Sequence, residues 1–170
     1  MEVDEHIACA MSGLTADART MVEHGRVEAQ NHRFSYNEAL PLESATQALC
    51  DLALRFGEGD DDSMSRPCGV ALLLAGWDAA GPGLFHAEPS GTFTRFDAKA
   101  IGSGSEGAQS TLQEQYRADM TLAEAQTLAL STLKAVMEEK VSATNVDIAT
   151  VAPTYELFTQ QQVQAVIDRL

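Results

Sequence analysis

The chain has 170 residues, enough for one hydrophobic core and too few for two comfortable domains. Its 25 acidic residues against 11 lysines and arginines give a net charge of -14, which argues against nucleic-acid binding and against anionic membrane surfaces. No apolar run is long enough to predict a transmembrane helix, and the acidic start, Met1–Glu5, lacks the layout of a signal peptide. The three cysteines, Cys9, Cys50 and Cys68, have no paired spacing, which indicates free thiols in an intracellular protein.

The first third of the chain predicts a strand followed by two helices. Ile7–Met11 is a short apolar run that Ser12–Gly13 ends, as in a buried strand. A helix is expected from Leu14 to about His32, with Thr15 as its cap and with a buried face made of Leu14, Ala18, Met21, Val22 and Ala29. A second helix begins near Pro41 and ends at Gly57, before an acidic loop at Glu58–Ser63, and its stripe is Leu42, Ala45, Leu49, Leu52 and Phe56.

The middle of the chain predicts an antiparallel meander of three strands. Val70–Ala75 is a continuous apolar run, typical of a strand that is buried on both faces. Leu84–Ala87 and Thr92–Phe96 follow, after turns that we expect at Asp78–Gly83 and Pro89–Gly91.

The last part predicts two more helices, a strand and a final helix. The first helix covers Gly104–Tyr116, with Ala108, Leu112 and Tyr116 at four-residue spacing. The second begins at a capping box, Thr121 and Glu124, and its expected buried face is Leu122, Ala125, Ala129, Leu133 and Val136. Val146–Val151 is predicted to be a strand. Thr159 and Gln162 predict the cap of a final helix. One side of that helix carries Val163, Val166, Ile167 and Leu170.

Helices therefore come in pairs instead of alternating with strands. This order disfavours a doubly wound parallel sheet and favours an α+β fold in which helix layers cover stacked antiparallel sheets.

One glycine-rich segment matches a nucleotide-binding pattern. Gly102–Gly107 fits G-x-G-x-x-G and lies between an extended segment and a helix. A dinucleotide-binding unit needs a second strand after that helix, whereas a second helix is predicted here. We therefore favour a strand-to-helix turn without a ligand and keep a nucleotide-binding module as an alternative.

No residue pattern predicts metal binding. The four histidines lie on different predicted elements without ligand spacing, and the carboxylates of Glu58–Asp62 lack the register of a calcium loop; the histidines are His6, His24, His32 and His86.

Nucleophilic catalysis also lacks a signature. Cys68 follows Arg66–Pro67, and a nearby cation can activate a thiol, but Cys68 opens an apolar strand and is expected to be buried and inert. Arg66 is expected to reach nearby carbonyls or carboxylates, and Cys9 and Cys50 read as core residues. The sequence thus predicts no catalytic residue, no cofactor-binding residue and no metal ligand.

An ordered set of short segments resembles the alpha-type subunits of the 20S proteasome, over nearly the whole chain. The strongest matching segment is Ala98–Gly102 followed by Ser105–Ser110. Asn31–His32, Tyr36–Glu38 and Met137–Asn145 are most like the alpha type-5 group of that family. The other segments are Ala10–Leu14, Ala16–Arg19, Arg26–His32, Ser65–Val70, Gly81–Pro82, Glu88–Thr92, Met120–Leu122 and Val136–Lys140.

The resemblance implies an Ntn-hydrolase-like four-layer αββα sandwich, with two antiparallel sheets between helix layers. It implies a non-catalytic structural subunit of the outer ring, which supports ubiquitin-dependent protein degradation. The partners that it implies are other alpha subunits in a seven-membered ring, beta subunits below that ring, and a regulatory particle. The location that it implies is cytoplasm and nucleus. The proteolytic threonine belongs to certain beta subunits, so no catalytic residue carries over. No nucleic acid, membrane or cofactor is expected.

Two departures from the family pattern bear on assembly. Family members begin with a gating tail, a helix and two strands that would precede Met1, so residues 1–170 are expected to be one proteasome-subunit domain that is incomplete at its N-terminus and lacks the first strands. Cys68 stands where the family usually has Phe. Loss of two sheet strands exposes edges and apolar faces, so self-association is a further hypothesis.

An independent N-terminal-nucleophile hydrolase is the alternative function.

Overall fold

The computed structural model describes residues 1–55 and 66–170. The described residues form two compact units. Unit 1 is residues 1–96 with 151–155, and unit 2 is residues 97–150 with 156–170. That residues 1–170 make a single subunit domain stays a prediction, and each unit is described by itself below.

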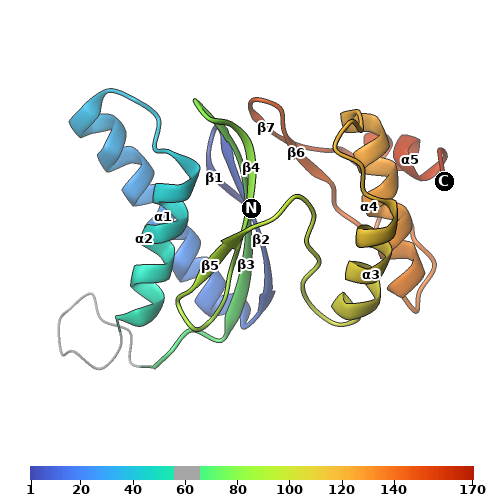
Figure 1. Cartoon of the computed structure of the whole chain (residues 1–170), viewed down its shortest axis with the longest axis horizontal. Coiled ribbons are helices and arrows are strands. Elements are labelled where there is room, and N and C mark those ends of the chain that lie inside the picture. Colours follow the sequence, from blue (N-terminus) through green and yellow to red (C-terminus); the bar gives the residue numbers. More distant parts are fainter. Residues whose placement is uncertain (56–65) are drawn as a thin grey trace. The chain divides into compact units, whose positions relative to one another are not determined.

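Unit 1 is built on a five-stranded antiparallel sheet whose strands lie in the order β1-β2-β3-β4-β5 (Figure 1). The strands are β1 (Glu2–Asp4), β2 (Ile7–Gly13), β3 (Val70–Asp78), β4 (Gly81–Ala87) and β5 (Phe93–Arg95). The predicted meander from β3 to β5 is confirmed. The predicted turn at Asp78–Gly83 was too long, because β4 already begins at Gly81. β1 was not predicted as a separate strand.

Two helices, α1 (Thr15–Tyr36) and α2 (Leu42–Leu54), cover one face of this sheet (Figure 1). Thr15 was predicted to cap α1, but the N-cap residue is Leu14, which makes no side-chain capping bond. Instead, the backbone N–H of Leu14 donates to the carbonyl of Gly69 at 3.0 Å. The helix ends one turn later than expected, where Asn37 takes a left-handed conformation (φ 53°) and donates its N–H to Arg33.

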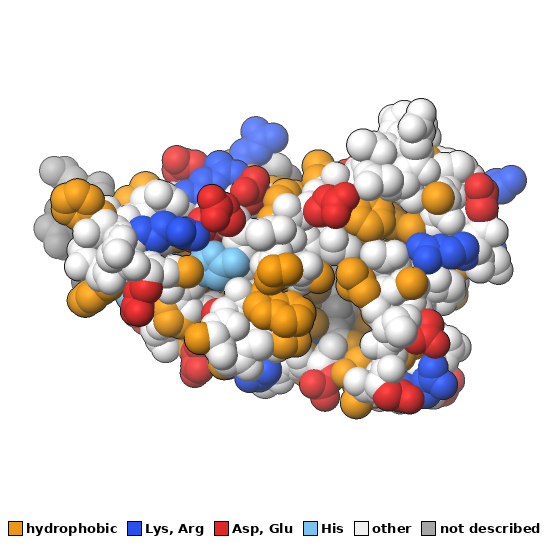
Figure 2. All heavy atoms as spheres, turned by 90° about the horizontal axis from the view of Figure 1, so that it is seen from above, with side chains coloured by type: hydrophobic (Ala, Val, Ile, Leu, Met, Phe, Trp, Pro, Cys, Tyr) orange, Lys and Arg blue, Asp and Glu red, His pale blue; other side chains and the backbone are white. Residues whose placement is uncertain are grey.

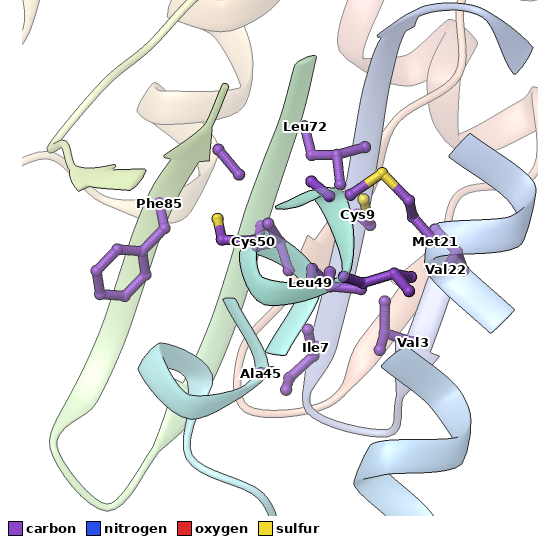
Figure 3. Close-up of a cluster of buried hydrophobic side chains, with 14 of the residues drawn as sticks. Val3, Ile7, Cys9, Met21, Val22, Ala45, Leu49, Cys50, Leu72 and Phe85 are labelled. Atoms are coloured by element: carbon purple, nitrogen blue, oxygen red, sulfur yellow. The ribbon is translucent and has the colours of Figure 1, made fainter. Parts of the chain in front are cut away.

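The core of unit 1 lies between the two helices and the covered face of the sheet. In β3 every second residue points into it, because successive side chains of a strand alternate between faces. Cys9 of β2, Leu74 of β3 and Phe85 of β4 lie opposite one another in the register of the sheet. Three strands therefore pack against the same two helices. Figure 3 shows this cluster, with Leu49 and Ala45 of α2 and Met21 and Val22 of α1 packed among the strand residues.

The prediction that β3 is buried on both faces was correct for only one face. Val70, Leu72 and Leu74 are buried, whereas the alternate residues Ala71, Leu73 and Ala75 are only partly buried. The predicted stripe of α2 is confirmed for Leu42, Ala45, Leu49 and Leu52, all fully or nearly buried. Phe56, Gly57 and the acidic loop Glu58–Ser63 lie outside the described residues.

Unit 2 contains α3 (Ser105–Gln115), α4 (Leu122–Val136) and α5 (Gln160–Ile167). Both predicted capping boxes are confirmed, with Thr121 paired to Glu124 and Thr159 paired to Gln162. The core of this unit is small and joins Leu130 of α4 and Val166 of α5 to Val141 and Val146 of the connecting segment.

The predicted buried face of α4 was wrong. Leu122 and Leu133 are 51% and 39% exposed, and Ala125 and Ala129 are exposed as well. The buried residues are Leu128, Leu130 and Thr132. Because α4 is apolar on more than one side, the helical period alone did not identify the face that packs.

The strand predicted at Val146–Val151 is shorter than expected. Only Ala149–Val151 forms a strand, β6, and it pairs with β7 (Tyr155–Leu157), which was not predicted. The antiparallel five-stranded sheet, the separate two-stranded sheet and the five described helices agree with the predicted α+β fold class of Ntn-hydrolase type. No described helix is long and apolar enough to cross a bilayer.

Candidate functional sites and the family of the chain

The glycine-rich loop before α3 has a structural explanation that does not involve a ligand. Gly102 and Gly104 take left-handed conformations, with φ of 96° and 75°, which L side chains rarely adopt. A Cβ on Gly104 would lie 3.2 Å from Cβ of Val136, so the residue also allows α4 to pack closely. The element after α3 is helix α4, as predicted, and the strand that a dinucleotide-binding unit places there is missing from the described chain.

A single glutamine holds the segment that leads into this loop. The side-chain amide of Gln109 on α3 donates to the carbonyl of Ala98 at 3.3 Å, and its oxygen accepts from the N–H of Ala100 at 3.0 Å. The amide thus satisfies one donor and one acceptor of a non-helical backbone segment. We call these two hydrogen bonds the Gln109 clamp. Gln109 lies in the segment that most strongly resembles alpha-type subunits, and the clamp gives this residue a structural role that needs no ligand.

The three cysteines are buried and are not joined in disulfides. Burial raises the pKa of the Cys9 and Cys50 thiols to about 11. For Cys68, burial and the nearby Asp17 carboxylate raise the pKa, and together they outweigh the opposing effect of Arg66. Because the thiolate is the nucleophilic form, these environments disfavour catalysis by cysteine.

Arg66 reaches a carboxylate, as predicted. Its guanidinium donates to both oxygens of Asp17 on α1, at 2.8 and 3.0 Å, and also to the carbonyl of Pro67. The N–H of Gly69 donates to Asp17 at 3.0 Å. The pair therefore fixes the entry of β3 against the first turn of α1, and the hydrogen bond from Arg66 is the main reason that the pKa of Asp17 lies below its ordinary value.

Unit 2 carries an open hollow of about 640 Å³ beside α4. Its lining includes Arg117, Glu124, Thr127, Ser131 and Arg169. The hydroxyls of Thr127 and Ser131 donate to backbone carbonyls of their own helix, and neither is held by a basic side chain. Neither hydroxyl is therefore paired with a base among the described residues, as an activated nucleophile would be.

Metal-binding clusters are not found among the described residues. The prediction that the four histidines lie on different elements was wrong for one pair, because His24 and His32 both lie on α1; His6 follows β1 and His86 lies on β4. The acidic residues Glu58–Asp62 lie outside the described residues. That the chain has no catalytic, cofactor-binding or metal-binding residue stays a prediction.

Comparison with known families gives a match over most of the chain. The family model of proteasome subunits matches residues 1–151. The chain belongs to the proteasome subunit family.

Curated relatives of this proteasome-family chain make the match more specific. An alpha type-5 proteasome subunit from Dictyostelium discoideum is 54% identical over 176 residues, which span 100% of the chain and 73% of the relative. A probable alpha type-5 subunit from Schizosaccharomyces pombe is 61% identical over 153 residues, 88% of the chain and 62% of the relative. An alpha type-5 subunit from Drosophila melanogaster is 55% identical over 170 residues, 96% of the chain and 70% of the relative.

These matches agree with the resemblance to the alpha type-5 group. The Arg66 pair and the Gln109 clamp lie inside segments that carried the broader resemblance to alpha-type subunits, and the glycine-rich turn begins in one of them. The structure gives each of the three a role in packing. Sequence reasoning missed one buried polar pair, Asp4 and His6, in which Nδ1 of the ring lies 3.4 Å from Oδ2 of the carboxylate. Two polar residues at a short turn give no sequence signal that they will be buried together.

Proposed function

We propose that this proteasome-family chain is a non-catalytic structural subunit of the outer alpha ring of the 20S proteasome and supports ubiquitin-dependent protein degradation. The observation that carries the proposal is the family match over residues 1–151, together with relatives that are named as alpha type-5 subunits. Alpha subunits are the non-catalytic members of that complex, and the buried, high-pKa thiols of this chain support the same assignment.

The partners we propose are other alpha subunits in a seven-membered ring, beta subunits below it and a regulatory particle. The net charge of -14 supports protein partners over nucleic acid or anionic membranes. We propose cytoplasm and nucleus as the location of the chain, which the family resemblance implies.

Exposed apolar side chains in unit 1 support a role in assembly. On α1, Phe34 is 93% exposed and Val27 49%. Tyr36 is 69% exposed, and the centroid of its ring lies 4.7 Å from the centroid of the His32 ring. Large apolar and aromatic residues this exposed are a feature of protein interfaces.

Unit 2 has its own exposed apolar residues, on the face of α4 that carries Leu122 and Leu133. On the face of the molecule drawn in Figure 2, hydrophobic side chains gather in several places among acidic and basic ones.

The experiment is to express the tagged full chain in eukaryotic cells and to fractionate the lysate on native gels. We expect the tag to migrate with 20S particles and to co-purify with other alpha and beta subunits. Phe34→Ser should reduce this incorporation, whereas Gln30→Ser, an exposed polar position on the same helix, should not. A tag found only in free chain or in homo-oligomers would refute the proposal.

No observation favours the alternative of an independent hydrolase. Purified chain should not cleave fluorogenic peptides, and cleavage that a threonine-directed inhibitor abolishes would overturn the non-catalytic assignment.

A further inference from the structure

The hollow of about 640 Å³ lies wholly within unit 2, where α4 packs against both α3 and α5 (Figure 1). One side of α4 lines it at Ala123, Thr127 and Ser131, which are four residues apart and therefore share a face of the helix. Arg117, in the connection between α3 and α4, and Arg169, just after α5, also line the hollow. Its volume is large enough for a ligand or a short peptide segment, because ligand sites measure about 300–1,000 Å³.

The lining combines apolar side chains with hydrogen-bond acceptors. Met120, Ala123 and Leu128 supply the apolar part. The hydroxyl of Thr127 donates to the carbonyl of Ala123 at 3.0 Å, and the hydroxyl of Ser131 donates to the carbonyl of Leu128 at 2.9 Å. Each hydroxyl has only one proton, so its oxygen keeps lone pairs that accept further hydrogen bonds. The hollow thus offers apolar contact and acceptors for N–H groups, both of which suit a peptide.

The two arginines give the hollow a positive charge that its carboxylates balance only in part. The side chain of Arg117 is 61% exposed and lies 3.5 Å from Glu124 and 3.9 Å from Asp119. Only Oε1 of Glu124 faces this arginine, because Oε2 already accepts two hydrogen bonds in the cap of α4. Among the described residues, the guanidinium of Arg169 donates to a neutral acceptor alone, the amide oxygen of Gln126 at 3.1 Å.

We infer that this hollow is a docking groove for an acidic segment of a partner protein, in which carboxylates flank an apolar side chain. The carboxylates pair with Arg117 and Arg169, because a guanidinium binds a carboxylate through two parallel hydrogen bonds. The apolar side chain packs on Met120 and Leu128. A nucleic acid fits less well, because its phosphate chain would extend beyond two arginines onto a protein of net charge -14. The docking groove belongs to unit 2 alone, so its occupation does not depend on membership in the alpha ring.

Fluorescence anisotropy with the purified full chain tests the docking groove. The probe is a fluorescein-labelled peptide, Glu-Asp-Leu-Asp-Glu, with an amidated C-terminus, and the matched control is Gln-Asn-Leu-Asn-Gln. We expect saturable binding of the acidic peptide, about tenfold tighter than that of the neutral peptide and weakened by added salt. No saturable binding below about 1 mM, or equal affinities for the two peptides, would overturn the assignment.

Single substitutions locate the binding on the chain. Arg117→Gln and Arg169→Gln should each weaken binding of the acidic peptide by about three- to tenfold, because each removes a charged donor. Lys134→Gln removes one positive charge from an exposed position of α4 outside the lining and should change the affinity by less than about twofold. Equal losses for all three variants would mean that the peptide responds to net charge alone, which would contradict a built groove.

Nuclear magnetic resonance of the wild-type chain decides the matter if a variant does not fold. The acidic peptide should shift the backbone N–H signals of Thr127 and Ser131 more than those of Ala125 and Ala129, which are exposed and lie outside the lining. Shifts confined to other parts of the chain would contradict the docking groove. Displacement of the peptide by hexathymidylate at a lower concentration than by unlabelled peptide would replace the acidic segment with a phosphate chain and overturn the proposal.

Discussion

The guanidinium of Arg66 donates to both carboxylate oxygens of Asp17, at 2.8 and 3.0 Å, and so joins the segment before β3 to the first turn of α1. The side chain of Asp17 is 9% exposed and also accepts the N–H of Gly69. A buried carboxylate with three donors depends on its partner, because loss of the arginine leaves its charge poorly compensated.

Substitution of either partner should lower the unfolding midpoint of unit 1. Arg66→Ala is expected to cost more than Arg66→Lys, because lysine keeps a charge but cannot donate in a planar fork. Thermal unfolding followed by circular dichroism measures the order. Equal midpoints for wild type and Arg66→Ala would contradict the role assigned to the pair.

The same pair predicts a pH dependence. The hydrogen bonds from Arg66 and Gly69 hold the pKa of Asp17 below its ordinary value of 3.8, so the pair stabilises the fold above that pH. Its contribution is lost as the pH falls through the lowered pKa. Urea unfolding should show wild type more stable than Asp17→Asn near neutral pH, with the difference shrinking toward strongly acidic pH. A difference that does not change with pH would be inconsistent with this assignment.

The core of unit 1 should be sensitive to the loss of volume at one position of α2. Leu49 is fully buried, so Leu49→Ala is expected to destabilise the chain by about 2–5 kcal/mol. Leu54 lies on the same helix and is 53% exposed, and Leu54→Ala should cost clearly less. Comparable losses for the two variants in urea unfolding would contradict the packing described here.

The glycine-rich loop can be tested with two glycines only three residues apart. Gly104→Ala should destabilise unit 2, because its φ is 75° and a Cβ would press on Val136 at 3.2 Å. Gly107 lies within α3 and a Cβ there would meet Val136 at an ordinary 3.8 Å, so Gly107→Ala should be neutral or stabilise by up to about 1 kcal/mol. Thermal shift measures both, and a shift of the wild type on adding NAD or ATP would revive the nucleotide-binding interpretation.

The thiols should react only when the chain opens. Because burial raises the pKa of Cys9 and Cys50 to about 11, iodoacetamide near neutral pH should leave both unlabelled in the native chain and label both in urea. Mass spectrometry of the digested protein gives the labelled positions. Rapid native labelling of either thiol would show that the site is open to solvent.

Elements with one clear apolar stripe or a local cap were predictable. Leu42, Ala45, Leu49 and Leu52 lie on one side of α2, and that side is buried. The cap formed by Thr121 and Glu124 depends on four consecutive residues, so local sequence suffices.

Features that depend on distant contacts were not predictable. The start of α1 is set by a bond from Leu14 to Gly69, far along the chain, instead of by Thr15. The buried face of α4 depends on what packs against Leu128 and Leu130, and the buried ring of His6 contacts the carbonyl oxygen of Leu40, 34 positions along the chain. The family assignment needed no such contact, because it rests on an ordered set of short segments.

Native mass spectrometry of 20S particles, purified through a tag on this chain, tests whether the chain is part of the alpha ring. We expect intact particles that contain the tagged chain together with other alpha subunits and with beta subunits. Recovery of the chain alone, or only with copies of itself, from cells whose own 20S particles are intact would contradict its assignment as a structural subunit of the alpha ring.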